Sequence, residues 1–486
     1  MQPNKDGEQK LFSQFGLFSL LLSISFGNVY AQSFTEFKRI QSESFTKFRD
    51  KRDTAFSTYL QAQWQEYNAY VSQPLYAKEK PKSLPHLLQH TATPVGPHLL
   101  IQKNSFSKKK LEEIPKNIEI KGGVNINYFG ENISFDVAKS IKNAQYYPMN
   151  QKGIMNFFSV MAANNYDAVV ETVNSTCKQL HLNDWAVYLL VDKLSKKIYT
   201  NTDEAKLFSW FIFSKLGYKM KVALNKDNHI VLLSSVKGVM YSTPNYTLGN
   251  EKFYVVSHYD QGKIGNIYTY KKDYPNAEKS LDFSLKTLPS LQKNYKSRTV
   301  SFKEYGKLYT LSYQYNQNLL DFMASYPQVD YKVFFNAPLE DVTYKNIIDG
   351  LKPYIKDKKA SGSLNFLLSF VQKAFKYERD NEQFGHEKVM FADETLYYKA
   401  SDCEDRAVLY ARLVKDLFGI GVVGVKYKNH MSTALHIPMS GDSVKVSGER
   451  YVIADPTYIN ASLGENIPKY QSVIPDSFIH VRSVSN

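Results

Sequence analysis

Three residues in the last part of the chain have the types that catalysis by a thiol requires. Cys403 stands at the start of a predicted helix that ends at Gly419. Backbone N–H groups at a helix start favour a thiolate and can also stabilise an oxyanion. His430 and Asp455 follow on two predicted strands, where they would supply a base and a group that orients it. The order of these residues therefore predicts a Cys-His-Asp triad.

A second histidine, His436, lies on the same predicted strand as His430, and the alternation of strand faces cannot separate the two. If the two strands form a simple antiparallel pair, placing His430 opposite Asp455 centres the turn within residues 440–443. Placing His436 there would centre the turn inside a strand-like run. Because Ser447-Gly448 is a competing turn, the register favours His430 and leaves His436 as the alternative.

The chain has two cysteines, and we expect them to differ. Cys177 lies in an apolar helical pattern and is predicted to be buried and inert. Charged residues flank Cys403, which favours a reactive thiol over a structural one. Its acidic neighbours would raise the thiol pKa, so the helix start and His430 must compensate. A Cys177–Cys403 disulfide is the minor alternative, and a zinc site rich in cysteine is excluded. We expect no metal and no cofactor.

The residues around this triad closely resemble the catalytic domain of transglutaminase-like proteins, which have a papain-like thiol fold. The resemblance covers roughly residues 340–470 and rests on Asp-Cys-x-Asp-Arg-Ala at 402–407, Asp-Pro-Thr at 455–457, Phe375-Lys376-Tyr377 and Glu394-Thr395-Leu396. It implies Cys403 as nucleophile, His430 as base and Asp455 as orienting group. The family usually has an aromatic residue two positions after the histidine. This chain has Ser432 there, which leaves the choice of acyl acceptor open.

The elements that must position these residues occur twice along the chain. Helical patterns at about 151–216 and 340–418 are each followed by predicted strands, which indicates an α+β fold. We predict five segments: a signal peptide at 1–31, an amphipathic helix at 32–73, a Pro-containing linker at 74–117, an α+β domain at 118–335 and a transglutaminase-like catalytic domain at 336–486. A hairpin is expected around Gly122-Gly123.

The two α+β segments can be aligned at the positions of the predicted triad residues of the second segment. Asn201 aligns with Cys403 at an offset of 202 residues, His229 with His430 at 201, and Ser257 with Asp455 at 198. The middle domain is therefore predicted to be a degenerate copy of the same fold, which could bind a ligand but could not form a thioester. Chance similarity between two α+β halves is the alternative.

The N-terminal residues predict a secreted protein with an aromatic helix. Lys5 and Lys10, an apolar run at 17–26 and Ala31 are typical of a cleaved secretory signal, with an uncleaved membrane anchor as the alternative. The run is too short to span a bilayer. Behind it, aromatic residues recur every 11 positions from Phe34 to Tyr67 and again three positions later. This period places both rows on one helix face, which packs on its own protein, self-associates or binds a partner.

Composition narrows the classes of function. The chain of 486 residues is 43% hydrophobic, so it can form two or three globular domains. Its net charge of +14 is spread along the sequence, so we expect no nucleic-acid partner. We predict acyl transfer or amide hydrolysis through a Cys403 thioester on an extracytoplasmic protein or peptide. A non-catalytic peptide- or cell-wall-binding module that keeps the groove is the alternative, and an assembly role of the aromatic helix comes third.

Overall fold

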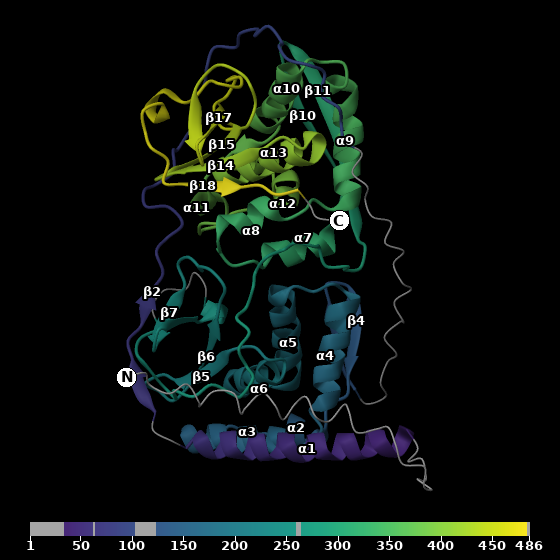
Figure 1. The fold of residues 1–486 in the computed structure, drawn as a ribbon, viewed down its shortest axis with the longest axis vertical. Helices are drawn as coiled ribbons and strands as arrows, with labels where there is room; N and C mark the ends of the chain where they lie inside the picture. Colours follow the sequence, from purple (N-terminus) through teal and green to yellow (C-terminus); the bar gives the residue numbers. More distant parts are fainter. Residues whose placement is uncertain (1–33, 62–63, 103–122, 259–263, 484–486) are drawn as a thin grey trace, which may run out of the picture. The chain divides into compact units, whose positions relative to one another are not determined.

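A computed structural model describes residues 34–61, 64–102, 123–258 and 264–483 (Figure 1). The predicted signal peptide at 1–31 lies outside the described residues. The chain divides into two compact units, residues 1–53 and 54–486. The second unit carries every residue of the predicted triad, and it is mixed α+β as expected. None of the described helices has the length and apolar character that crossing a membrane requires.

The N-terminal helix is shorter than predicted. Helix α1 spans Phe34–Tyr59, and β1 (Gln65–Tyr67) and β2 (Tyr70–Val71) follow where the aromatic period had predicted more helix. Both strands pair antiparallel with distant strands of one sheet. Such pairing overrides the local helical period, because aromatic residues also suit strands. Within the second unit, Phe56 and Leu60 at the end of this helix are buried in the core.

The first half of the second unit is a helical layer on an antiparallel sheet. It begins with the hairpin β3 (Val124–Tyr128) and β4 (Glu131–Phe135), whose turn lies at Phe129-Gly130. The first strand and Gly122 of the hairpin expected around Gly122-Gly123 lie outside the described residues. Its helices are α2 (Lys139–Lys142), α3 (Gln151–Ala162), α4 (Asp167–Gln179), α5 (Asp184–Ile198) and α6 (Thr202–Lys215). The strands are β5 (Met220–Leu224), β6 (Ile230–Ser235), β7 (Pro244–Leu248), β8 (Glu251–Tyr254) and β9 (Ile267–Thr269). Helix α6 packs on β5 and β6.

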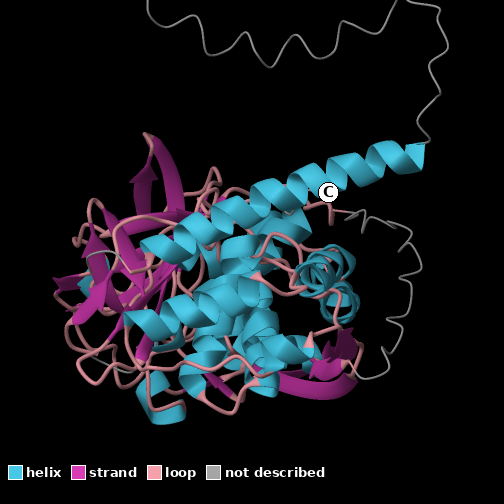
Figure 2. Ribbon diagram, turned by 90° about the horizontal axis from the view of Figure 1, so that it is seen from below, coloured by secondary structure: helices cyan, strands magenta, loops and turns pink. Residues whose placement is uncertain are grey.

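The second half repeats this construction around α13. Its helices are α7 (Gln317–Ala324), α8 (Tyr331–Asn336), α9 (Asp341–Ile355), α10 (Ala360–Lys373), α11 (Asp380–Gln383), α12 (Ala392–Tyr397) and α13 (Cys403–Phe418). Its five-stranded sheet contains β14 (Val422–Tyr427), β15 (His430–Leu435), β16 (Ser443–Val446), β17 (Glu449–Ala454) and β18 (Ser477–His480). Helix α13 packs on β14 and β15. Figure 2 shows the helices in cyan and the strands in magenta.

The two sheets share strand order and register. The order β5-β6-β8-β7 in the first corresponds to β14-β15-β17-β16 in the second. In the first, Ser234 lies opposite Tyr254, and in the second Leu435 lies opposite Val452. These pairs are related by the offsets of 201 and 198 that the sequence alignment predicts. Order and register together support a duplicated α+β unit over chance similarity.

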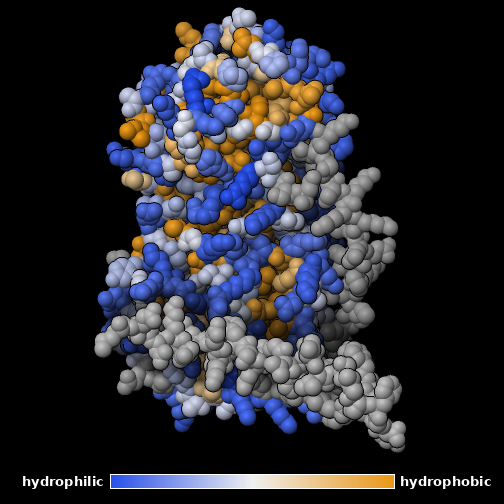
Figure 3. Space-filling view, in the orientation of Figure 1, coloured by the Kyte–Doolittle hydropathy of each residue, from blue (hydrophilic) through white to orange (hydrophobic). Residues whose placement is uncertain are grey.

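The halves are not separated at the predicted boundary of residue 335. The hairpin β10 (Tyr295–Glu304) and β11 (Lys307–Asn316) packs on α9 and α10, and α8 packs on α13. Elements before residue 335 therefore complete the core of the second half. The predicted linker contributes as well, since residues 74–102 cross this half and form hydrogen bonds with it. On the face drawn in Figure 3, hydrophilic side chains (blue) are spread widely and hydrophobic ones (orange) form smaller groups.

Candidate functional site

The structure brings His430 and Asp455 together. His430 is the first residue of β15, and Asp455 follows the last residue of β17. Nε2 of His430 lies 2.8 Å from Oδ2 of Asp455, and both side chains are buried. Burial alone would raise the pKa of Asp455, but the charge of His430 and hydrogen bonds from His430 and Thr457 lower it overall. Asp455 therefore stays ionised and fixes the orientation of the imidazole ring.

The strand connection differs from the one expected. β15 and β17 are antiparallel neighbours, but β16 intervenes in the sequence and pairs with the outer side of β17. The turn before β17 is the competing Ser447-Gly448, in which both residues have positive φ angles. The prediction of a turn at 440–443 is therefore wrong. The register nevertheless pairs Thr433 with Ala454, which brings the start of β15 close to the end of β17.

His436 lies at the other end of β15, away from this pair. Its side chain is 49% exposed, and its Nε2 lies 3.4 Å from the carboxylate of Glu449. Its ring stacks on Tyr451 with centroids 5.0 Å apart. The geometry therefore associates His430, and not His436, with Asp455.

Aromatic residues that sequence analysis missed support the imidazole. The ring of His430 stacks on Tyr470 with centroids 4.9 Å apart, and Tyr470 in turn stacks on Tyr427 at 4.6 Å. The Tyr470 hydroxyl donates a hydrogen bond to Oδ1 of Asn429, the residue before His430. Tyr470 ends a short 3-10 helix, Pro468–Tyr470, and only the tertiary fold places it here. The hydroxyl of Ser432 is buried and has no hydrogen-bond partner among the described residues.

Cys403 is the first residue of α13, as the sequence predicts, but its thiol is closed off. The residue is 1% exposed. Its Sγ lies 3.1 Å from Oε2 of Glu404 and 3.9 Å from the hydroxyl of Tyr76. In the described part of the chain it forms no hydrogen bond with His430. Burial raises the thiol pKa well above its usual value, and Glu404 and Asp402 raise it further. The expected compensation by the helix start and His430 is therefore insufficient in this closed arrangement.

Cys177 is not part of the site. It lies in α4, where it is partly buried, and burial raises its thiol pKa to about 12. Both cysteines are free, so the minor alternative of a Cys177–Cys403 disulfide is wrong.

A buried lysine lies at the centre of an acidic cluster beside Cys403. Nζ of Lys80 lies 2.7 Å from carboxylate oxygens of Asp380 and Glu387 and 2.8 Å from Glu404, and it also contacts Asp402. Burial alone would lower the pKa of Lys80, but these carboxylates raise it well above its usual value. Burial raises the pKa values of Asp380 and Asp402, whereas the pKa of Glu404 is lowered by Lys80 and hydrogen bonds despite its burial. An ionised Glu404 therefore pairs with the ammonium group.

The same carboxylates are the candidate metal ligands of the described chain. Ligand atoms lie within 4.8 Å of one another in three groups: Asp402, Cys403 and Glu404; Asp380, Asp402 and Asp405; and Asp380, Glu387 and Glu404. Lys80 Nζ contacts members of every group, so the ammonium group of the lysine already provides the positive charge that these carboxylates would otherwise take from a metal ion. A metal ion at these ligands would have to displace the lysine side chain.

Lys80 and Tyr76 both belong to residues 75–90, which we call the strap. The sequence predicts that this stretch belongs to the linker, because its prolines and its lack of a hydrophobic period give no sign of contacts with residues more than 300 positions away. Besides its contact with Cys403, the Tyr76 hydroxyl donates a hydrogen bond to Oε2 of Glu404 at 3.0 Å. The strap is therefore part of the site.

The aligned positions in the first half lack a thiol nucleophile. Asn201 caps α6, with its Oδ1 accepting a hydrogen bond from the backbone N–H of Asp203. Nδ1 of His229 lies 2.7 Å from Oδ2 of the same Asp203, while Ser257, the counterpart of Asp455, is exposed. A histidine-carboxylate pair remains, but no thiol accompanies it.

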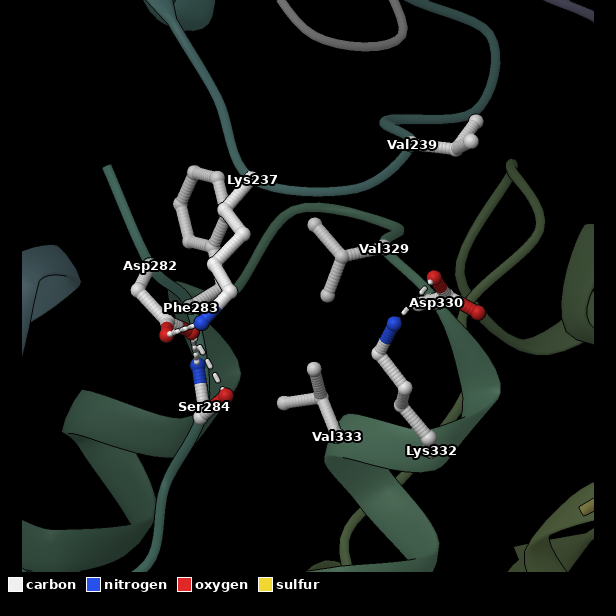
Figure 4. A pocket seen from close by; sticks show the side chains of 9 residues that line it. All are labelled: Lys237, Val239, Asp282, Phe283, Ser284, Val329, Asp330, Lys332 and Val333. Atoms are coloured by element: carbon white, nitrogen blue, oxygen red, sulfur yellow. Dashed lines mark hydrogen bonds and ion pairs between the residues drawn. The ribbon is translucent and has the colours of Figure 1, made fainter. Parts of the chain in front are cut away.

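A separate pocket lies between the strand ends of the first half and α8 (Figure 4). Its charged side chains are paired with each other: Lys237 with Asp282 at 3.1 Å, and Lys332 with Asp330 at 2.9 Å. Val239, Val329 and Val333 are among its apolar lining residues. None of the predicted triad lines it, so it does not extend the thiol site.

Comparisons with known proteins identify no relative. No family model, curated protein or solved structure matches the chain. The resemblance to transglutaminase-like proteins therefore rests on the motif residues alone.

Proposed function

We propose that the protein is a thiol-dependent acyltransferase or amide hydrolase that acts on an extracytoplasmic protein or peptide through a thioester on Cys403. The single observation that carries this proposal is the buried His430–Asp455 pair, at 2.8 Å, in which His430 begins β15, a strand that packs against the helix beginning at Cys403. A buried carboxylate that holds an imidazole in one orientation is what a general base beside a nucleophile requires. The motif resemblance supports the same assignment.

The proposed reaction has two steps. Nε2 of His430 is engaged by Asp455, which leaves Nδ1 to take the thiol proton. The sulfur attacks the amide carbonyl, the C–N bond breaks, and the leaving amine receives the proton from His430. Water or an amine then attacks the thioester carbonyl, and the thiolate leaves and recovers a proton. The first backbone N–H groups of α13 are the donors available to the oxyanion, because a helix start leaves them without helical partners.

A non-catalytic peptide-binding module is the second candidate. The observation that favours it is the thiol itself, which is buried, protonated and hydrogen-bonded to Glu404 and not to the imidazole. A binding module would keep the groove but not the reaction. Turnover separates the two proposals.

Incubation with a glutamine peptide and a labelled primary amine tests the reaction, with amine incorporation and amide hydrolysis measured together. Cys403→Ser and His430→Ala should each reduce turnover by about 10²-fold or more. The matched controls Cys177→Ser and His436→Ala should retain most activity, since neither side chain contacts the pair. Activity that survives Cys403→Ser, or that is lost in His436→Ala alone, would overturn the assignment.

A further inference from the structure

The thiol proposed as nucleophile cannot be reached by a substrate in this arrangement. Cys403 is 1% exposed, and Tyr76 and Lys80 of the strap are buried beside it. Thioester formation needs a carbonyl carbon within about 3–3.5 Å of the sulfur before attack. Some covering group must therefore move before chemistry occurs.

The strap touches the surroundings of all three predicted triad residues. At Cys403 it contributes the Tyr76 hydroxyl and the Lys80 ammonium group. Next to His430, Nδ2 of Asn429 donates a hydrogen bond to the carbonyl of Glu79 at 3.2 Å. Just after Asp455, Ile459 pairs in both directions with the strap: its N–H donates to Pro85 O at 3.0 Å, and its carbonyl accepts from Leu87 N–H at 2.9 Å. One continuous segment thus crosses the whole site.

The strap is also held in a way that permits release. It contains no helix and no strand ladder, only an isolated bridge at His86. Between residues 81 and 90 none of its side chains is fully buried. Side chains of the second half also anchor its backbone at two positions between residues 81 and 90: the Tyr377 hydroxyl donates to Pro81 O at 2.6 Å, and Nδ2 of Asn460 donates to Leu87 O at 2.8 Å. The Tyr305 hydroxyl holds the far end of the strap through His90 O at 2.8 Å. Segments with few buried contacts open at low free-energy cost, and residues 81–90 of the strap meet this description.

We propose that the strap is an autoinhibitory segment, which closes the Cys403 site in the resting protein and must leave it before a substrate can bind. This inference rests on the proposed function, because only a reactive thiol gives the closure a consequence. Lys80 makes the closed state specific: its ammonium group neutralises carboxylates that would otherwise be buried without a cation. Opening exchanges this pairing for solvent or for a cationic group of a partner.

The rate of alkylation of Cys403 by iodoacetamide, mapped by mass spectrometry in the full chain, tests the closure directly. The double variant Tyr377→Phe/Asn460→Gly removes the hydrogen bonds to Pro81 O and Leu87 O and leaves Tyr76, Lys80 and the triad in place. Asn460 has φ +67°, so glycine suits its backbone. Two lost hydrogen bonds should speed alkylation of Cys403 by roughly 10-fold or more. Cys177 in the same sample reports whether the fold as a whole has loosened.

A matched control is Tyr268→Phe/Asn276→Gly in the first half, where Asn276 has φ +64°. It should leave the Cys403 rate unchanged. A second variant, Lys80→Met, should also expose Cys403, whereas Lys78→Met, at an exposed strap position, should not. An unchanged Cys403 rate in the folded anchor variant would overturn the strap proposal. Faster alkylation without any turnover would instead uphold the strap and overturn the proposed function.

Discussion

At the scale of single residues, burial decides which carboxyl groups keep their protons. Asp393, near the start of α12, is an example outside the proposed site. Its side chain is buried beneath the start of α9, where the backbone N–H of Glu340 donates to both of its oxygens at 3.3 and 3.4 Å. Burial is the largest cause that raises its pKa, to about 8, and the nearby Glu340 adds to it. Asp393 is therefore protonated in the folded protein at pH 7.

The proton bound to Asp393 makes the stability of the folded protein depend on pH, and the direction of the change can be stated. The unfolded chain releases the Asp393 proton near pH 4, whereas the folded chain keeps it until about pH 8. Between these values the folded state binds more protons, so this group makes stability fall as pH rises, by at most about 1.4 kcal/mol per pH unit. Asp393→Asn should remove that contribution.

Urea unfolding of the wild type and Asp393→Asn at pH 4.5, 6 and 7.5 measures the difference. The free energy of unfolding of the variant minus that of the wild type should increase as pH rises. Other titrating groups are common to both proteins and cancel. A constant difference across these pH values would contradict the raised pKa.

At the scale of elements, the aromatic side chain of Phe56 helps to anchor the end of α1. Phe56 is buried, with ring centroids 5.2 Å from Tyr274, 5.3 Å from Phe158 and 6.2 Å from Trp210. Of the aromatic row that predicted a long helix, this member packs inside its own protein. Here the self-packing alternative holds, and a partner is not required to cover Phe56.

Phe56→Ala should therefore destabilise the second unit by about 3–5 kcal/mol, since it removes a buried ring and leaves a cavity. Thr58→Ala, two residues on and exposed, is the matched control and should change stability by less than about 0.5 kcal/mol. Thermal or urea unfolding followed by circular dichroism compares the two. Equal, small effects would show that this helix end is not docked in solution.

At the scale of the whole molecule, the second half is not an independent domain that begins after residue 335. The hairpin β10–β11 covers α9 and α10 of the second half, and Glu304 of β10 accepts a hydrogen bond from Ser369 of α10 at 3.0 Å. The second half therefore needs residues that precede its predicted boundary. Its core is completed from two sides, by this hairpin and by the strap.

Two fragments test this boundary. Residues 290–486 keep β10, β11, α7 and α8, whereas residues 336–486 lack them, and both lack the strap. The longer fragment should unfold with the more cooperative thermal transition, because the apolar faces of α9, α10 and α13 remain covered. Circular dichroism and differential scanning calorimetry compare the thermal unfolding transitions of the two fragments. A fragment 336–486 that folds as well as the longer one would restore the predicted boundary.

The sequence alone determined the features that depend on local pattern. Capping and glycine signals place the start of α13 at Cys403 and its end before Gly419. Alternation predicts the strand that begins at His430 and the strand that ends just before Asp455. The internal offsets of 201 and 198 residues also anticipated the repeated register. The capping, glycine and alternation patterns each involve residues within about 20 positions of one another. The offsets come from a direct comparison of two segments of the same sequence.

Only the tertiary structure decided what surrounds those residues. Tyr76 and Lys80 lie more than 300 positions before Cys403, and no local period predicts that they cover it. The raised thiol pKa follows from burial, which is a property of the packed chain and not of neighbouring sequence. Long-range strand pairing likewise ended α1 at Tyr59 against its aromatic period. Local patterns thus placed the reactive groups on their elements, while packing between distant segments determined their protonation and access to solvent.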